Sequence, residues 1–177
     1  MRKNTSEDET GRAEYRAALK RLAREVALVT GFLTIFFTFV FGITVQHGND
    51  MYPAIRDGDI VLYYRTHDIL NTEAVVCSVG GETCTGRVEA VSGTVISATG
   101  DLQMTFDGLY LPISQREGIY TRTYAEENMK LPLTVKENHY FLLGDNRDEA
   151  RDSRTYGQVN SRNIKGRIVA VLRRRQI

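Results

Sequence analysis

The sequence predicts an all-β, mainly antiparallel domain that follows a single N-terminal transmembrane helix. Two patterns predict this division: residues 26–45 contain no charged side chain, and short apolar or β-branched runs separated by glycine and aspartate begin at residue 59. A length of 177 residues suits one ordinary domain with an appendage. The net charge of +1 lacks the excess of basic residues that is typical of a nucleic-acid-binding protein.

The charge-free segment is long enough to cross a bilayer, because about twenty helical residues span a hydrocarbon core of roughly 30 Å. Apolar side chains lie all round the segment, so it lacks the polar stripe of a soluble amphipathic helix; a buried core helix is the alternative. No small-x-small cleavage site follows Val45, which favours an uncleaved signal anchor over a cleaved signal peptide.

The flanks of the segment predict its orientation. Four basic residues lie between positions 16 and 24, whereas the first basic residue after the segment is Arg56. Because basic flanks stay in the cytoplasm, we expect a single-pass protein of the cell membrane with a cytoplasmic N-terminus and an extracellular C-terminal domain. The predicted divisions are a cytoplasmic tail over residues 1–25, a transmembrane signal anchor over 26–46 and an extracytoplasmic domain over 47–177.

The extracytoplasmic part has the pattern of several short strands with turn residues between them. Gly80-Gly81, Gly100-Asp101 and Asp107-Gly108 are turn-forming pairs. Such spacing favours an antiparallel meander or barrel. The expected strands cover residues 59–64, 74–79, 82–91, 94–99, 102–106, 139–143 and 164–173.

Both cysteines fall on one predicted hairpin. If Gly80-Gly81 forms a two-residue turn, Val79 pairs with Glu82 and Cys77 lies directly opposite Cys84. A disulfide would persist outside the cell, although a hydrogen-bonded cross-strand position, with Cα atoms about 5.5 Å apart, would strain the bridge. Two free thiols that pack as small hydrophobes are the alternative, and the sequence leaves both possibilities open.

Three further motifs follow the apolar segment. The first is N-D-M-Y-P-A-I from Asn49, followed by G-D-I-V from Gly58; the second is T-G-R-V from Thr85; the third is G-D-N-R-D-E-A-R-D-S-R-T-Y-G from Gly144. Together with the apolar anchor, these motifs resemble those of type I signal peptidases, which are membrane-anchored serine proteases that remove signal peptides at the outer face of the membrane. The resemblance covers about residues 26–171 and implies the β-rich fold of that family.

Three positions depart from the family pattern. Asp50 stands where the family has its nucleophilic serine, Gly86 where it has the general-base lysine, and Ala150 where it has the serine that orients the lysine. A serine protease needs a hydroxyl nucleophile and a base, and loss of such a group typically costs about 10⁴-fold in turnover. The departures predict a non-catalytic homologue, not an enzyme. The alternatives are an active signal peptidase whose altered chemistry uses Asp50, and a structural membrane module.

The resemblance also implies how the domain binds a partner and which residues support it. Family members hold substrate as an extended strand beside sheet edges. No metal or cofactor is expected, because the three histidines lack metal-ligand spacing. The implied peptide groove comprises His47, Asp50, Met51, Tyr52, Pro53, Glu82, Thr83, Cys84 and Thr85, and the implied structural network comprises Gly144, Asp145, Asn146, Arg147, Asp152, Ser153, Arg154 and Gly157.

Signal-peptidase-like proteins without the serine and lysine occur in pilus gene clusters of Gram-positive bacteria, where they assist sortase-dependent polymerisation of pilins. The resemblance to that group implies that this chain binds an exported polypeptide such as pilin at the membrane, in a chaperone-like role, with a sortase as a further partner. No nucleic-acid partner is expected.

Overall fold

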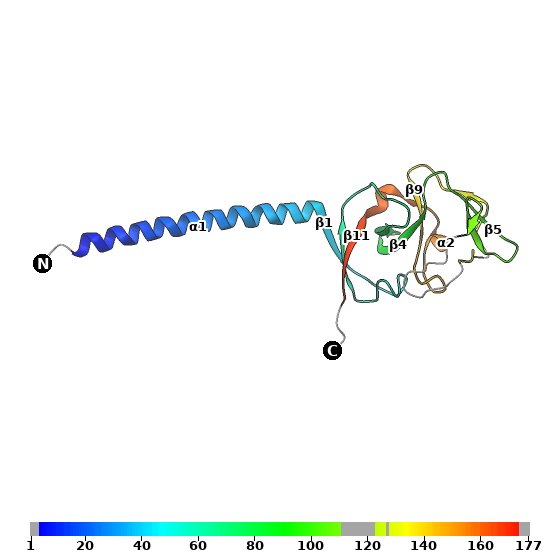
Figure 1. Ribbon diagram of the computed structural model, residues 1–177, viewed down its shortest axis with the longest axis horizontal. Coiled ribbons are helices and arrows are strands. Elements are labelled where there is room, and N and C mark those ends of the chain that lie inside the picture. Colours follow the sequence, from blue (N-terminus) through cyan, green and yellow to red (C-terminus); the bar gives the residue numbers. More distant parts are fainter. Residues whose placement is uncertain (1–3, 111–122, 127, 174–177) are drawn as a thin grey trace. The chain divides into compact units, whose positions relative to one another are not determined.

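The structure is a computed structural model that describes residues 4–110, 123–126 and 128–173, with side chains in its first helix described at residue 12 and from residue 14 onward. The chain divides into two compact units, residues 1–40 and residues 41–177, each of which is described by itself. The first unit contains one long helix, and the second contains the strands (Figure 1).

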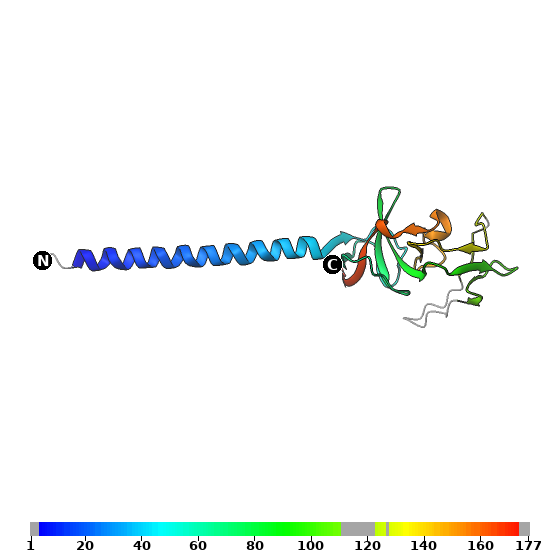
Figure 2. The same cartoon turned by 90° about the horizontal axis from the view of Figure 1, so that it is seen from above.

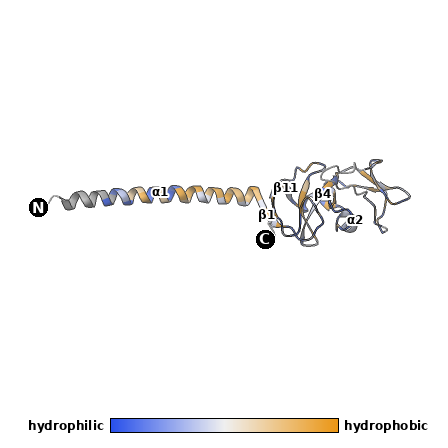
Figure 3. Ribbon diagram, turned by 60° about the horizontal axis from the view of Figure 1, so that its bottom comes forward, coloured by the Kyte–Doolittle hydropathy of each residue, from blue (hydrophilic) through white to orange (hydrophobic). Residues whose placement is uncertain are grey.

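The first unit is formed by helix α1, Asn4–Val40, whose C-terminal half is apolar (Figure 3). Large apolar side chains such as Phe32, Ile35 and Phe39 are exposed along it. Thr34 and Thr38 donate their hydroxyl hydrogen bonds to backbone carbonyl oxygens one turn earlier, which satisfies these polar groups within the helix. By length and composition, Glu14–Val40 can cross a membrane. The helix therefore fits a membrane anchor, and its orientation stays a prediction.

The apolar segment predicted as one span is helical only as far as Val40. Residues Phe41–Val45 form strand β1, which pairs antiparallel with β2 and so satisfies its backbone in the sheet. Gly42 permits this close pairing, because a Cβ atom at this position would lie 2.2 Å from the ring of Tyr63. The structure thus assigns residues 41–45 to the second unit, and the helix that is long and apolar enough to cross a membrane is Glu14–Val40.

The described part of the second unit contains two antiparallel sheets. The larger has the strand order β1-β2-β11-β3-β4-β9-β10, and the smaller has the order β7-β6-β5-β8. Figures 1 and 2 show β5 towards one end of this unit and β11 towards the other. The remaining elements are β2 Ile60–Tyr64, β3 Ala74–Val79, β4 Glu82–Ala90, β5 Val95–Ala98, β6 Met104–Phe106, β7 Leu109–Tyr110, β8 Leu133–Thr134, β9 His139–Leu143, helix α2 Ser153–Tyr156, β10 Val159–Asn160, the short 3₁₀ helix Ser161–Asn163 and β11 Ile164–Leu172.

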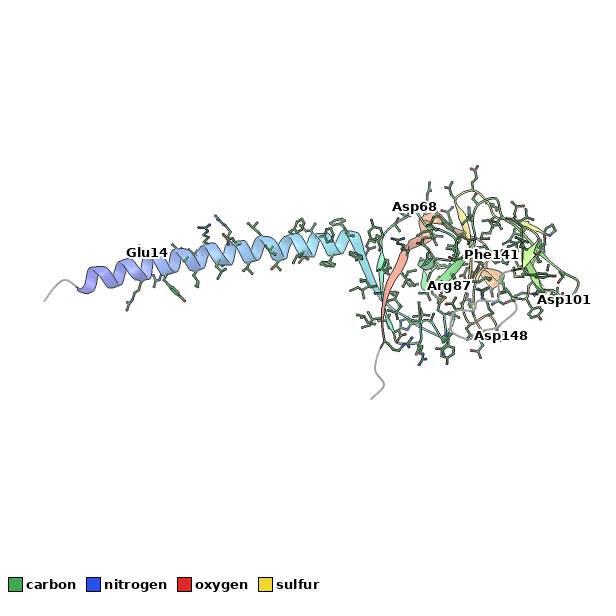
Figure 4. The ribbon with its side chains drawn as sticks, in the orientation of Figure 1. Glu14, Asp68, Arg87, Asp101, Phe141 and Asp148 are labelled. Atoms are coloured by element: carbon green, nitrogen blue, oxygen red, sulfur yellow. The ribbon has the colours of Figure 1, made fainter. Side chains whose placement is uncertain are left out.

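Strand β9 is buried on both faces and joins two parts of the core. Phe141 and Leu143 pack with Ile96 of the smaller sheet, whereas Leu142 packs with Val88 on the other face. This arrangement explains why β9 is a continuous apolar run rather than an alternating one. Figure 4 shows Phe141 inside the unit.

The predicted antiparallel, β-rich fold is confirmed. The observed β3 and β9 have the predicted bounds, and the predicted register of the first hairpin, with Cys77 opposite Cys84, is also observed. Gly80 and Gly81 have φ values of 61° and 88°, as a tight two-residue hairpin turn requires. The short elements β7, β8, β10 and α2 were not predicted, because two to four residues are too few to display a hydrophobic period.

Candidate functional site

Asp50 lies in the turn-rich segment after β1 and is held by the third motif. Its backbone carbonyl oxygen accepts a hydrogen bond from the Asn146 N–H at 3.0 Å. Its carboxylate Oδ1 accepts one from the Arg151 N–H at 3.1 Å. The fold therefore joins the first and third motifs at this residue.

Gly144 allows the two motifs to approach this closely. A Cβ atom at Gly144 would lie 2.2 Å from the Cβ of Ala150 and 2.4 Å from the carbonyl oxygen of Asp50. Neither neighbour can move easily, because Ala150 is buried and the Asp50 carbonyl is backbone. Asp50, Gly144 and Ala150 consequently form one tight contact.

Gly86, the third departing position, is buried on β4 beside β9. A Cβ atom there would lie 3.2 Å from the Cβ of Leu142. The preceding residue, Thr85, donates a hydrogen bond from Oγ1 to Oε1 of the buried Gln46 at 2.7 Å. Strand β4 is thus tied through Thr85 to the segment that carries Asp50, while Gly86 packs towards Leu142.

One side of β4 is unpaired over residues 82–86 in the described part of the chain. Strand β9 pairs with β4 only from Arg87 onward, since the chain turns towards Asp50 at Gly144. The two-residue turn makes Glu82, Cys84 and Gly86 the positions that hydrogen-bond to β3. Thr83 and Thr85 therefore direct their backbone N–H and C=O groups away from β3. We call the residues 82–86 on this side the free edge of β4.

Charged side chains flank the free edge. Glu82 and Arg151 are highly exposed and form a loose ion pair at 3.8 Å, and Lys165 donates a hydrogen bond from Nζ to Thr83 Oγ1 at 2.6 Å. Within residues 4–110, 123–126 and 128–173, no three His, Cys, Asp or Glu side chains gather as metal ligands. The edge thus presents backbone hydrogen-bonding groups together with charges of both signs.

Two ion pairs connect the third motif to β4. Arg87 donates to both carboxylate oxygens of Asp145 at 2.8 and 2.7 Å, which raises the pKa of the Arg87 guanidinium. Arg147 contacts Glu89 at 2.5 Å, and each side chain is only 10% exposed. Burial raises the pKa of Glu89, and the charge of Arg147 opposes that rise. These pairs position the loop that holds Asp50.

Asp152 fixes the other end of the third motif. It caps helix α2, and its Oδ2 accepts hydrogen bonds from the Gly144 N–H at 3.0 Å and from Arg154 Nη2 at 2.8 Å. The neighbouring Ser153 accepts a hydrogen bond at Oγ from the Leu142 N–H at 2.9 Å. Both side chains are buried. Asp152 therefore holds Gly144, which in turn contacts Asp50.

Met51 corrects one sequence-based expectation. The sequence places it in the peptide groove, but it is completely buried with Ile55, Val61 and Val76 in the core cluster next to β2. Its apolar, flexible side chain fills the space under the turn after β1. The other implied peptide-contacting residues vary in exposure: His47, Tyr52, Glu82 and Thr83 are exposed, Asp50, Pro53 and Cys84 are half-buried, and Thr85 is buried.

The sequence-based reasoning missed two residues that support the site. Gln46 was placed within the anchor, yet it is buried and bonded to Thr85. A polar residue at the end of an apolar run was the signal that could have identified it. Glu89 pairs with Arg147 across 58 positions of sequence, and no local pattern indicates such a partner.

The family model and the curated relatives agree on one family. The model of the family "Signal peptidase, peptidase S26" matches residues 19–173. Signal peptidase I T of Bacillus subtilis (strain 168) is 23% identical over 163 residues, which are 86% of this chain and 83% of that protein. Signal peptidase I of Aquifex aeolicus (strain VF5) is 40% identical over 48 residues, which are 27% of this chain but only 19% of that protein. A crystal structure of a signal peptidase I from Enterococcus faecalis V583 aligns with a TM-score of 0.44 and 22% identity, over 58% of this chain and 97% of that one.

These comparisons overturn the prediction that the chain is not an enzyme. The matched family is one of peptidases, and the relatives carry the name signal peptidase I. Three departures from the motifs do not by themselves establish inactivity. The prediction that the chain is not an enzyme is therefore wrong. The family match begins within the basic flank, at residue 19, and extends through the last described strand, and the chain therefore belongs to the signal peptidase family, peptidase S26.

Proposed function

We propose that the β domain binds an exported polypeptide as an extended segment along the free edge of β4, beside Asp50. The observation that supports this proposal most strongly is the edge itself, where β9 departs and the backbone groups that Thr83 and Thr85 direct away from β3 meet no further strand among the described residues. Thr83 is the exposed position of this edge, and Thr85 is buried. An added strand gains main-chain hydrogen bonds whatever its sequence, and neighbouring side chains then select among peptides.

Asp50 supplies the charge that favours a basic residue in the bound segment. One carboxylate oxygen, Oδ1, is bonded to the Arg151 N–H, and no hydrogen bond to Oδ2 comes from the described residues. The carboxylate is half-buried, so its interaction with a cation is less screened than at a fully exposed site. A lysine or arginine of the bound segment is the group that this oxygen would attract.

The charge preference is tested with Asp50→Asn, which keeps the shape of the side chain. A fluorescein-labelled peptide from the signal-peptide region of an exported preprotein is titrated against the full-length chain in detergent micelles, with lysine or norleucine at one scanned position. At the position that meets Asp50, the lysine peptide should lose about fivefold in affinity for Asp50→Asn, which corresponds to an ion pair of about 1 kcal/mol.

Two controls make that result specific. The norleucine peptide should bind both proteins equally, and Asp148→Asn, which changes an exposed carboxylate of the same motif (Figure 4), should leave the lysine peptide unaffected. Equal affinity of every lysine peptide for wild type and Asp50→Asn would contradict the role of Asp50.

Cleavage of the bound polypeptide is the second candidate function, and the names of the relatives favour it. Asp50 is the titratable group at the position of the family nucleophile, and a carboxylate can serve as a general base towards water. The full-length chain is incubated with a preprotein, and its products are identified by mass spectrometry. This candidate predicts a new N-terminus after the signal peptide with wild type and none with Asp50→Ala. An intact preprotein after incubation with wild type would eliminate it.

For the exported polypeptide, we propose a pilin that a sortase polymerises; the resemblance described above is the support for this finer assignment. Deletion of the gene should then reduce the surface polymer, and the wild-type gene should restore it. Unchanged polymer assembly in the deletion strain would contradict the assignment of a pilin as the bound polypeptide.

A further inference from the structure

Cys77 and Cys84 are two neighbouring cysteines that take no part in the ion pairs described above. They lie opposite each other in the β3–β4 hairpin, and both are free thiols in the structure. Cα atoms of opposed residues in a hydrogen-bonded pair are about 5.5 Å apart, a separation that a disulfide can bridge. The backbone therefore holds two thiols at positions that a single bond can join.

The two thiols differ in their access to solvent. Cys77 is 0% exposed and packs with Val75, Val88 and Ile164 in the core. Cys84 lies at the border of that cluster and is half-buried. A reagent in solution therefore meets the sulfur of Cys84 first, and Cys77 is reached mainly from Cys84.

The surroundings also differentiate the two thiols chemically. A hydrogen bond with Cys77 lowers the pKa of Cys84, and the charge of Lys165 acts in the same direction, whereas burial and Asp50 oppose the shift. The same hydrogen bond, together with burial, raises the pKa of Cys77. Lys165 is kept near the hairpin by its bond to Thr83. A thiolate at Cys84 and a thiol at Cys77 correspond to an attacking and a resolving cysteine.

We propose that Cys84 and Cys77 form a thiol–disulfide exchange site whose substrate is a disulfide, carried by a small thiol compound or by an exported polypeptide. The Cys84 thiolate attacks one sulfur of that disulfide, forms a mixed disulfide and releases the other half, which takes up a proton. Cys77 then attacks the sulfur of Cys84, and its proton passes to the second departing thiolate. Two protein thiols are thereby oxidised to one intrachain disulfide, and the substrate disulfide is reduced to two thiols.

This inference does not depend on the proposed peptide binding, because neither step needs a polypeptide on the free edge of β4. It also differs from a purely structural bridge. A structural disulfide needs no difference in access between its cysteines, whereas exchange needs one reachable sulfur and one protected sulfur directly beside it.

The test uses the full-length chain in detergent micelles and the aromatic disulfide dithiobis-nitrobenzoate, which releases one coloured thiolate at each exchange step. Wild type should release two equivalents and retain no aromatic adduct in its mass spectrum. Cys77→Ser should release one equivalent and retain the adduct. Cys84→Ser should react at least about tenfold more slowly than wild type, because its remaining sulfur, on Cys77, is buried.

The pH dependence of Cys84 alkylation tests the assigned roles separately from packing, because a change in packing alone would not shift it. Alkylation of Cys84 in wild type should reach half of its maximal rate at a lower pH than in Cys77→Ala, which lacks the hydrogen bond that favours the Cys84 thiolate. Cys77 should not react over the same range, since its pKa is raised. Identical profiles for Cys84 in the two proteins would contradict the assigned roles.

Three further results would overturn the proposal: a persistent aromatic adduct on wild type, equal reaction rates for the two single serine variants, or no intrachain disulfide in wild type after treatment with an excess of dithiobis-nitrobenzoate. The last measurement requires no variant, so it remains decisive if a substitution unfolds the hairpin. Parallel reactions with oxidised glutathione and with a disulfide-containing peptide distinguish the two sources of substrate.

Discussion

Gly144→Ala is expected to destabilise the β domain by about 3 kcal/mol, at the upper end of the range for overpacking a well-packed site. The added methyl group would lie 2.2 Å from Ala150 and 2.4 Å from the carbonyl oxygen of Asp50. Relief requires backbone movement, since the Gly144 N–H is also fixed by Asp152. The substitution should therefore separate the first and third motifs as well as weaken the fold.

The matched control is Gly100→Ala. Nothing lies within 4 Å of a Cβ atom at Gly100, so this change should be neutral or should stabilise by up to about 1 kcal/mol through the unfolded chain. Urea unfolding of each protein in micelles, followed by tyrosine near-ultraviolet circular dichroism because the chain has no tryptophan, measures both effects. Equal midpoints for the two variants would contradict the close approach at Gly144.

Asp152→Ala is expected to cost about 3–5 kcal/mol of stability, the range for breaking a buried ion pair by removing one partner. The side chains of Asp152 and Arg154 are 3% and 8% exposed, so the substitution leaves a buried guanidinium without its carboxylate. It also removes the acceptor for the Gly144 N–H. The measurement is the same urea titration, with the free energy of unfolding compared with wild type.

Glu82→Ala provides the comparison for an exposed pair. Glu82 meets Arg151 at 3.8 Å with side chains 81% and 72% exposed, and such surface pairs contribute between zero and about 1 kcal/mol. If Asp152→Ala cost no more than Glu82→Ala, the third motif would not depend on its buried pair, and the account of how Gly144 is held would be wrong.

The sequence predicted those parts of the fold that depend on neighbouring residues. The β3–β4 hairpin follows from Gly80-Gly81 and its flanking strands, so its register could be derived before the structure was known. Strand β1 could not be separated from α1, because residues 41–45 are as apolar as the helix before them. Their strand conformation depends on pairing with β2, about twenty positions away.

The candidate site shows the same division between local and distant information. The motifs identified Asp50, Gly144 and Ala150, which the structure brings into one contact. The burial of Met51 could not be foreseen, since an apolar residue in a turn suits a peptide contact and a core equally well. Activity could not be predicted from local pattern: three departures from the motifs suggested an inactive chain, whereas residues 19–173 match a peptidase family.

The central claim is that a polypeptide adds to the free edge of β4 through main-chain hydrogen bonds. The most direct measurement compares the affinity of the labelled peptide for Thr83→Pro and Thr83→Val in the full-length chain, with the free energy of unfolding of both variants as the check on folding. Proline removes the outward N–H, whereas valine removes only the hydroxyl that Lys165 contacts. The account predicts about tenfold weaker binding for Thr83→Pro, the effect of one lost hydrogen bond, and nearly wild-type binding for Thr83→Val. Equal affinity of the two folded variants would contradict it.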